Sequence, residues 1–257
     1  MAKSKIKKKI IAIVQARCNS IRLPNKVLKK FDGKPAIEIL YERLNLSKKL
    51  NNIIIATSKN PSNLKLVSFC KEKKFDFFLG SENNVLKRYF DCAKIFRVRN
   101  IIRVTSDCPL IDPYLVKKMY KNFQKNKTEY LANTLPEKNK KYPDGSDIEI
   151  FTFAALKKMY KLKLNKHDRE HVTNKFWDSG KFKKKIFFSK LDFSKYRYSI
   201  DYQSDVTVVR FIIAKLIKLN QFGFVKEIVN IIEKNKNIKK IMSQNMIQQK
   251  LRRKNIF

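Results

Sequence analysis

Residues 10–14 read Ile-Ile-Ala-Ile-Val, and residues 15–28 continue directly as Gln-Ala-Arg-Cys-Asn-Ser-Ile-Arg-Leu-Pro-Asn-Lys-Val-Leu. A short apolar run is typical of a strand buried on both faces, as in a parallel sheet. The polar loop after it then lies at the carboxyl end of the strand, the edge where open α/β sheets bind ligands. Arginine forks, an ammonium and a hydroxyl suit phosphate oxygens, although basic loop residues are commonly only solvated. The candidate nucleotide-binding residues here are Ala16, Arg17, Ser20, Arg22 and Lys26.

A second strand end carries an acidic residue. Residues 101–104 are mostly apolar, and Asp107 follows them shortly before Pro109, which cannot donate to a strand ladder. A carboxylate facing a triphosphate repels it unless a divalent cation lies between them. Because hard oxygen donors suit Mg²⁺, Asp107 is predicted to be a magnesium ligand.

The loop at residues 15–28 resembles the sequence Gln-Ala-Arg-x-Gly-Ser-x-Arg-Leu-Pro-Gly-Lys of the sugar-acid cytidylyltransferases. This family includes the CMP-KDO and CMP-sialic acid synthetases, and the chain is most similar to the branch typified by the spore coat protein SpsF. Asn19 and Asn25 replace the two glycines; Asn enters the left-handed region at modest cost, so the same loop shape is expected. The resemblance implies CTP as the nucleotide. It also implies a Rossmann-like, mixed but mainly parallel α/β sheet flanked by helices, with a small strand-containing dimerisation arm.

Two further segments resemble the same family. Residues 198–205 are similar to Thr-Val-Asp-x-Pro-Glu-Asp-Leu, which implies Asp201 as a second Mg²⁺ ligand. Asp205 is expected to cap a helix that begins at Val206, a position that tolerates Asn. Residues 80–89 resemble Gly-Ser-x-x-Asp-Val-Leu-x-Arg-Tyr, a region near the nucleotide base in relatives. The candidates there are Ser81 and Arg88, and a plain strand, turn and helix entry is the alternative.

The acceptor site is expected between these acids. In residues 142–151, Pro-Asp-Gly predicts a turn, and the following alternation puts Asp147 and Glu149 on one strand face. This segment resembles Tyr-Pro-Asp-Gly-x-Asp-x-Glu of the SpsF branch, and both acids are candidates for binding acceptor hydroxyls. A solvent-facing polar strand is an equal alternative.

Both histidines lie in residues 167–171. Their i, i+4 spacing is that of a zinc hydrolase helix, but the Glu stands in the wrong position. Residues 169–173 instead resemble the Arg-Glu-His-Val-Thr that borders the acceptor pocket in the SpsF branch. The resemblance implies that Arg169 meets a sugar carboxylate, and that His171 binds a hydroxyl or assists in proton removal.

Composition favours one intracellular domain. The chain has 257 residues, 43% of them hydrophobic, and alternating strand and helix patterns predict a single domain over residues 1–257. Residues 131–196 are expected to supply the acceptor site and the dimer arm, and residues 205–257 the C-terminal helices. The four cysteines form no Cys-x-x-Cys pair, which favours a reducing cytoplasm, and no stretch is long enough for a membrane span.

The net charge of +37 allows a second class of function. Such a basic chain is typical of a binder of nucleic acid or anionic surfaces, yet the lysines are spread throughout and no nucleic-acid motif accompanies them. The predicted function is therefore Mg²⁺-dependent transfer of CMP from CTP to a sugar acid of the KDO, sialic, legionaminic or pseudaminic type, in a homodimer. The alternatives are a phosphonate or alditol phosphate acceptor, or a noncatalytic polyanion binder. The predicted catalytic residues are Arg17, Lys26, Asp107 and Asp201.

Overall fold

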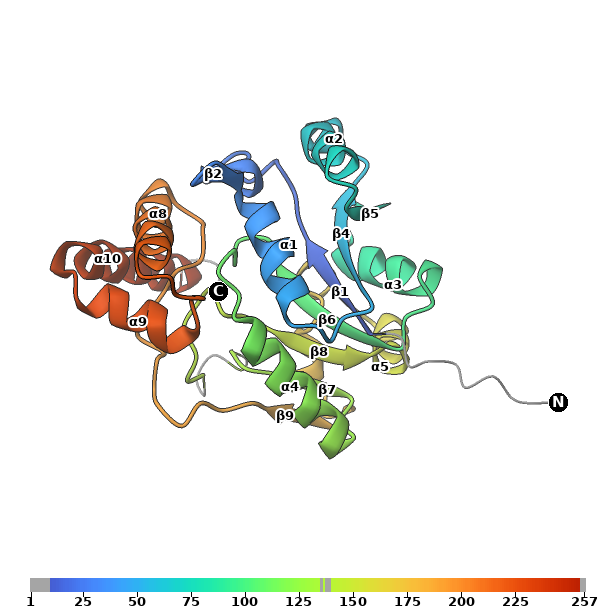
Figure 1. Ribbon diagram of the computed structural model, residues 1–257. Coiled ribbons are helices and arrows are strands. Elements are labelled where there is room, and N and C mark those ends of the chain that lie inside the picture. The colour runs from blue at the N-terminus through green and yellow to red at the C-terminus, as the bar shows by residue number, and fades with distance from the viewer. Residues whose placement is uncertain (1–9, 135, 137–139, 255–257) are drawn as a thin grey trace.

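A seven-stranded sheet in the order β5-β4-β1-β6-β8-β7-β9 forms the centre of the molecule (Figure 1). The computed structural model describes residues 10–134, 136 and 140–254. The strands are β1 (Ile10–Gln15), β4 (Asn52–Ser58), β5 (Asp76–Gly80), β6 (Asn100–Thr105), β7 (Tyr130–Ala132), β8 (Glu149–Thr152) and β9 (Lys184–Ile186). β8 runs antiparallel to both of its neighbours, and the other pairings are parallel. This confirms the predicted mixed, mainly parallel α/β sheet.

Each face of the sheet is covered by helices because the central strands are apolar on both sides. In β1, Ile10, Ala12 and Val14 enter one core cluster, and Ile11 and Ile13 enter the other. The first cluster includes α1 (Ala36–Leu46), α2 (Leu64–Glu72) and α4 (Pro113–Asn126). The second includes α3 (Val85–Ile95), α5 (Phe153–Tyr160) and α7 (Asn174–Asp178), while α6 (Lys166–His171) packs on α3. In Figure 1, α1 and α4 lie in front of the sheet.

Three C-terminal helices pack together at one side of the molecule, as predicted for this part of the chain (Figure 1). They are α8 (Gln203–Lys218), α9 (Val225–Glu233) and α10 (Lys236–Lys254). Two short 3₁₀ turns, η1 (Lys26–Leu28) and η2 (Pro61–Asn63), and the hairpin of β2 (Lys30–Phe31) and β3 (Lys34–Pro35) complete the described elements.

The region from residue 131 to residue 196 is more closely joined to the main fold than its expected role as an arm implies. In its described part, β7, β8 and β9 all extend the central sheet, and α5 to α7 connect them. A use of this region in dimerisation stays a prediction.

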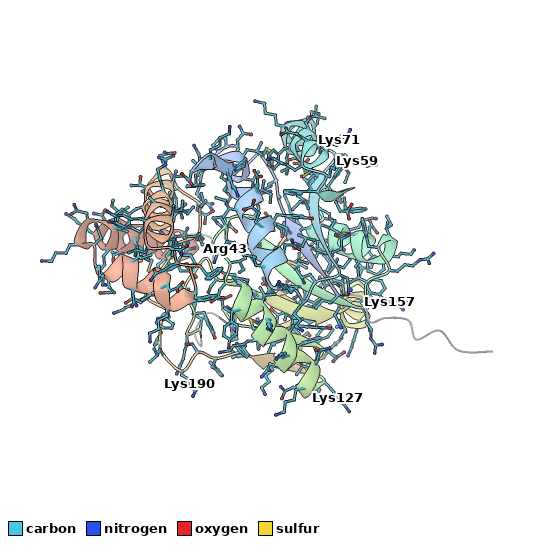
Figure 2. The ribbon with its side chains drawn as sticks, in the orientation of Figure 1. Arg43, Lys59, Lys71, Lys127, Lys157 and Lys190 are labelled. Carbon is cyan, nitrogen blue, oxygen red and sulfur yellow. The ribbon has the colours of Figure 1, made fainter. Side chains whose placement is uncertain are left out.

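Positive charge is distributed over several sides of the molecule. Figure 2 labels Lys59, Lys71, Lys127, Lys157 and Lys190, which extend from different elements around the fold. This arrangement follows the even spread of lysines along the chain. In the portion that the structure describes, no helix combines the length and the apolar character needed to cross a membrane.

Candidate active site

The basic loop after β1 is closed on itself and hydrogen-bonded to η2, the 3₁₀ turn that follows β4. The N–H of Asn25 donates to the carbonyl of Cys18 at 2.8 Å, and the Cys18 N–H donates to Oδ1 of Asn63 at 2.8 Å. Asn25 has a φ of 55°, so the asparagine does adopt the left-handed conformation. Asn19 does not have a positive φ; its amide instead donates to Oε1 of Glu82 at 2.7 Å. The loop therefore keeps a turned shape with only one left-handed residue.

The outer part of this loop presents cations to solvent. Arg17 and Arg22 are exposed, Ser20 is partly exposed, and Ile21 between them is 96% exposed. Burial and the charge of Arg17 both lower the pKa of Arg88, which places Arg17 near a second guanidinium. Ala16 is buried, and its N–H donates to the carbonyl of Ala56. The exposed side chains of the loop are thus the ones that an anion from solvent would meet first.

Lys26 lies between the two predicted metal ligands. Its Nζ is 2.9 Å from Oδ1 of Asp201 and 3.4 Å from Oδ2 of Asp107, and it donates to the carbonyl of Ile200 at 2.9 Å. Arg22 Nη2 also approaches Oδ1 of Asp201, at 2.7 Å. The structure thus brings together acids and bases that are far apart in the sequence, at the carboxyl edge of β1 and β6.

The Asp201 carboxylate is strongly stabilised in its ionised form. Burial alone raises the pKa of Asp201, but the nearby charges of Lys26, Arg197 and Arg22 outweigh burial and hold the pKa at about 2. The carboxylate therefore remains charged throughout the neutral and mildly acidic range.

The lowered pKa of Asp201 predicts that part of the free energy of unfolding is lost in acid. Ionised Asp201 stabilises the fold above its ordinary pKa of 3.8, and the stabilisation is lost as the pH falls through about 2. Thermal melts of the wild type should lose stability more steeply between about pH 4 and pH 2 than melts of Asp201→Asn. Parallel curves for the two proteins would contradict the ion pairs described here.

A buried arginine that the sequence patterns did not indicate organises the neighbouring acids. Arg197 is 1% exposed; its Nη2 lies 3.1 Å from Oδ2 of Asp201 and 3.1 Å from Oδ2 of Asp205, and its Nη1 lies 3.6 Å from Oδ2 of Asp144. Asn245 of α10 donates to Oδ1 of Asp205 at 2.7 Å. We call Asp144, Arg197, Asp201, Asp205 and Asn245 the buried ion cluster.

Asp205 has more contacts than a helix cap needs. Its Oδ2 accepts the N–H groups of Asp201 at 2.8 Å and Tyr202 at 2.9 Å, so it does cap a helix, but α8 begins at Gln203 rather than Val206. Because Asp205 is also 2% exposed and paired with Arg197, we now expect Asp205→Asn to destabilise the fold, in contrast to the tolerance expected from the sequence.

One of the two predicted acceptor acids lies beside the metal-ligand candidates. The thiol of Cys108 is 3.6 Å from Oδ1 of Asp107 and 3.7 Å from Oδ2 of Asp147. Asp147 is partly exposed. The turn that carries Asp147 therefore adjoins the end of β6.

Glu149 does not have the acceptor-binding position that the sequence predicted. The predicted alternation is present, since Ile148 and Ile150 enter one core cluster and Phe151 the other. Glu149, however, is 5% exposed, and its carboxylate accepts hydrogen bonds from Arg103 and from the Tyr130 hydroxyl. It therefore supports the sheet and is no longer a candidate for acceptor binding.

Ser81 and Arg88 form the turn and helix entry that the sequence allowed as the alternative. Arg88 is 2% exposed, its Nε donates to the carbonyl of Ser81 at 2.9 Å, and its Nη2 donates to the carbonyl of Glu82 at 3.1 Å. A Cβ on Gly80 would lie 2.6 Å from Cγ of Arg88. Arg88 thus holds the loop after β5 in shape, and a contact of these residues with a nucleotide base stays a prediction.

Arg169 and His171 both lie exposed on α6. The His171 ring is 4.2 Å from that of His167, and Arg169 Nε donates to the carbonyl of Leu164 at 3.3 Å. Over the residues that are described, no three His, Cys, Asp or Glu side chains are grouped to hold a metal ion. The acceptor roles of Arg169 and His171 stay predictions.

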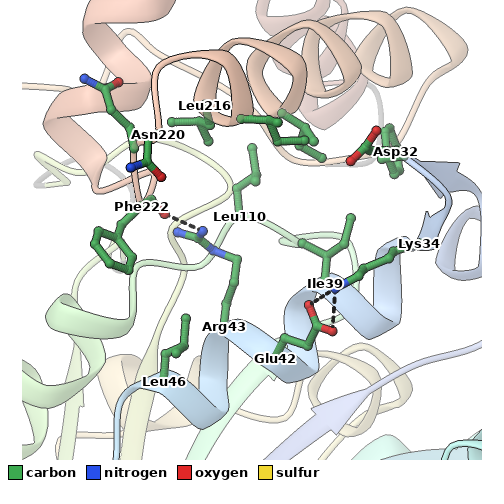
Figure 3. A pocket seen from close by; sticks show the side chains of 14 residues that line it. Asp32, Lys34, Ile39, Glu42, Arg43, Leu46, Leu110, Leu216, Asn220 and Phe222 are labelled. Atoms are coloured by element: carbon green, nitrogen blue, oxygen red, sulfur yellow. Dashed lines mark hydrogen bonds and ion pairs between the residues drawn. The ribbon is translucent and has the colours of Figure 1, made fainter.

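A cavity of about 460 Å³ lies between α1, the β2–β3 hairpin and the end of α8 (Figure 3). Arg43 crosses it and donates to the carbonyl of Phe222, and Lys34 pairs with Glu42 beneath. None of the candidate active-site residues lines this cavity. The candidate site is instead the charged edge formed by the loop after β1 and the end of β6.

A family model described as cytidylyltransferase matches residues 11–229, which include this entire charged edge. The chain belongs to the cytidylyltransferase family. The resemblance seen in the loop sequence is thereby confirmed.

Individual proteins support the same assignment. The uncharacterised protein MJ1063 of Methanocaldococcus jannaschii is 34% identical over 91% of this chain and 95% of its own length. SpsF of Bacillus subtilis is 37% identical over 43% of this chain and 48% of its own length. An 8-amino-3,8-dideoxy-manno-octulosonate cytidylyltransferase of Shewanella is 30% identical over 49% of this chain and 52% of its own. The structure of a cytidylyltransferase from Leptospira borgpetersenii superposes with a TM-score of 0.81 at 31% identity, covering 91% of this chain and 97% of that one.

Proposed function

We propose that this member of the cytidylyltransferase family transfers CMP from CTP to a hydroxyl of a sugar acid and releases pyrophosphate, for surface polysaccharide synthesis. The observation that carries the proposal is the position of Lys26 between Asp107 and Asp201, at the sheet edge where the loop after β1 presents Arg17 and Arg22. A triphosphate needs cations of this kind around its oxygens. Family membership favours this reading over a noncatalytic polyanion binder.

The chain's own residues divide the chemistry between them. The exposed Arg17 and Arg22 are suited to the β and γ phosphates, and Lys26 can turn from the carboxylates toward the same groups. The acceptor hydroxyl attacks the α-phosphorus in line, and these cations stabilise the charge that develops on the leaving pyrophosphate. Such electrostatic positioning requires no covalent enzyme intermediate.

The acids at this edge fit a magnesium ion. Asp107 and Asp201 supply hard oxygen donors, and the Lys26 ammonium shows that one cation can contact both carboxylates. Mg²⁺ commonly takes one or two carboxylates and fills its remaining positions with phosphate oxygens and water. When bound, it would neutralise phosphate charge and lower the pKa of the attacking hydroxyl.

The acceptor class rests on relatives and on the turn at residues 143–147. The partial match to the 8-amino-3,8-dideoxy-manno-octulosonate enzyme favours an eight-carbon keto-sugar acid, and the partial match to SpsF favours a role in polysaccharide synthesis. Asp147 beside Asp107 is the residue best placed to meet its hydroxyl. The homodimer and the cytoplasmic location expected from the sequence belong to the same proposal.

A pyrophosphate-release assay tests this function directly. The four nucleoside triphosphates would each be combined with Mg²⁺ and a panel of keto-sugar acids, with a phosphonate and an alditol phosphate as further acceptors. Pyrophosphate release is expected only when CTP is the nucleotide and a sugar acid is the acceptor, with at least one acid of the panel active. Release with the phosphonate or alditol phosphate alone would reassign the acceptor, and no release with any pair would contradict the proposal.

Arg17 is the cleanest test of the phosphate loop, because Arg22 and Lys26 also hold Asp201. Arg17→Ala should weaken Mg-CTP binding by about 1.5–3 kcal/mol, the range for a hydrogen bond to a charged group. Isothermal titration measures this, with the exposed Lys30→Ala variant of the following segment as the matched control. Unchanged affinity in Arg17→Ala would return this residue to a solvated surface position.

A further inference from the structure

The side chain of Asn133 holds the backbone on both sides of Asp147. Asn133 is fully buried; its amide donates to the carbonyl of Ser146 at 2.8 Å, and its Oδ1 accepts the N–H of Ile148 at 2.8 Å. One side chain therefore fixes the residues before and after Asp147. Such a clamp orients a side chain more firmly than an ordinary loop does.

The turn before Asp147 also donates a hydrogen bond to the Asp147 carboxylate. Gly145 has a φ of 106°, and a Cβ there would lie 2.7 Å from the N atom of Ser199, so the position requires glycine. The Gly145 N–H donates to Oδ2 of Asp147 at 2.8 Å, and the Cys108 thiol approaches the same oxygen. The Gly145 N–H sets the direction of the Asp147 carboxylate, and the Cys108 thiol lies between this carboxylate and that of Asp107.

We propose that Asp147 is the general base that accepts the proton of the attacking acceptor hydroxyl. The inference rests on the proposed function and gives a role to a residue that sequence patterns assigned only to acceptor binding. The acceptor oxygen forms a bond to the α-phosphorus, the bond from phosphorus to the pyrophosphate oxygen breaks, and the hydroxyl proton passes to the Asp147 carboxylate. That proton then leaves to solvent through the partly exposed face of the residue.

The surroundings suit this role. Burial and the charge of Asp144 raise the pKa of Asp147 to about 6, while Gly145, Thr134 and Lys140 oppose the rise. A base with a pKa just below the working pH is largely ionised yet still a good proton acceptor. The titratable groups that face it are Cys108, Asp144, Lys140 and Tyr198, and Asp107 lies on the other side of the Cys108 thiol.

A carboxylate kept with a raised pKa also has a predicted cost in stability. For an acid whose pKa is higher in the folded state, ionisation weakens the fold, so stability falls as the pH rises through about 6. A neutral Asn at this position should therefore leave the melting temperature equal to or above that of the wild type at pH 7. A carboxylate needed only for structure would behave in the opposite way.

The test compares Asp147→Asn and Asp147→Ala with the exposed control Asp192→Asn, using CTP and the best acceptor from the assay above. Both Asp147 variants should lose about 10²–10⁴-fold in kcat, the usual contribution of a general base, with Mg-CTP affinity unchanged by titration and a cooperative melt. The wild type and Asp192→Asn should show kcat/KM falling below about pH 6, and the residual activity of Asp147→Asn should lack this dependence.

Three outcomes would overturn the inference. They are retention of more than about a tenth of the kcat in both Asp147 variants, a parallel loss of Mg-CTP binding, or a lowered melting temperature in Asp147→Asn. A wild type that releases no pyrophosphate with any acceptor is a distinct result, because it removes the proposed function itself and the base role with it.

Discussion

Asp107→Asn should lower turnover at least about 100-fold and leave the protein folded. Asp107 follows the end of β6, is only partly buried, and contacts the ammonium of Lys26 and the Cys108 thiol. Loss of its charge removes one of the two carboxylates proposed to hold Mg²⁺ and leaves the triphosphate poorly neutralised. Pyrophosphate release under saturating CTP and acceptor measures the effect, and a thermal melt checks folding.

The matched control is Asp91→Asn, which removes a partly exposed carboxylate paired with Lys87 on the surface of α3. Its activity should equal that of the wild type. The double variant Asp107→Asn/Asp201→Asn should be little slower than the slower single variant, because groups that act as one unit are not additive. Wild-type turnover in Asp107→Asn would remove this residue from the mechanism.

Arg197→Met should destabilise the fold by about 3–5 kcal/mol, the cost of leaving buried charges without their partner. Its guanidinium is the cation shared by Asp201, Asp205 and Asp144. Arg197→Lys keeps the charge but not the planar fork, so it should recover part of the loss. Urea unfolding measures the free energies, with Lys239→Met, which breaks an exposed pair with Glu233, expected to cost less than about 1 kcal/mol. Equal midpoints for Arg197→Met and the wild type would contradict a buried ion cluster.

The sequence predicts the fold where a short run of neighbouring residues determines an element. The apolar run at residues 10–14 predicts β1, and the small polar residues that end β4 and β6 mark the carboxyl edge of the sheet. The left-handed turn at Asn25 follows from the limited set of residues that tolerate it. The meeting of Lys26 and Asp107 follows in turn from strand order, because parallel neighbours end at the same edge. Asp201 follows no strand, and it is brought to this edge by the hydrogen bond from the Ile200 N–H to the carbonyl of Asp107.

The remaining features depend on contacts that no local pattern encodes. Alternation placed Glu149 on one face of a strand, but which face is covered depends on the helices that pack there. Phe176 of α7 joins the core cluster on one side of β8, and Glu149 pairs with Arg103 and Tyr130. Arg197 stands among 59 lysines and arginines, and its burial arises only when segments around residues 144, 201 and 245 meet. The contacts of Asn133 likewise form only in the folded chain, since its partners lie thirteen and fifteen residues ahead.

The contact between Asn245 and Asp205 should determine when the buried ion cluster can be completed during synthesis of the chain. Asn245 lies 40 residues beyond Asp205, within the last helix that the structure describes. A growing chain can form β1, β4 and β6 early, since domains organise from the N-terminus as they emerge from the ribosome. The acids around Arg197 cannot gain their full set of partners until α10 has been made. The buried ion cluster should therefore be completed last, so a truncated product that still folds its sheet would lack the Asn245 contact that holds Asp205 beside Arg197.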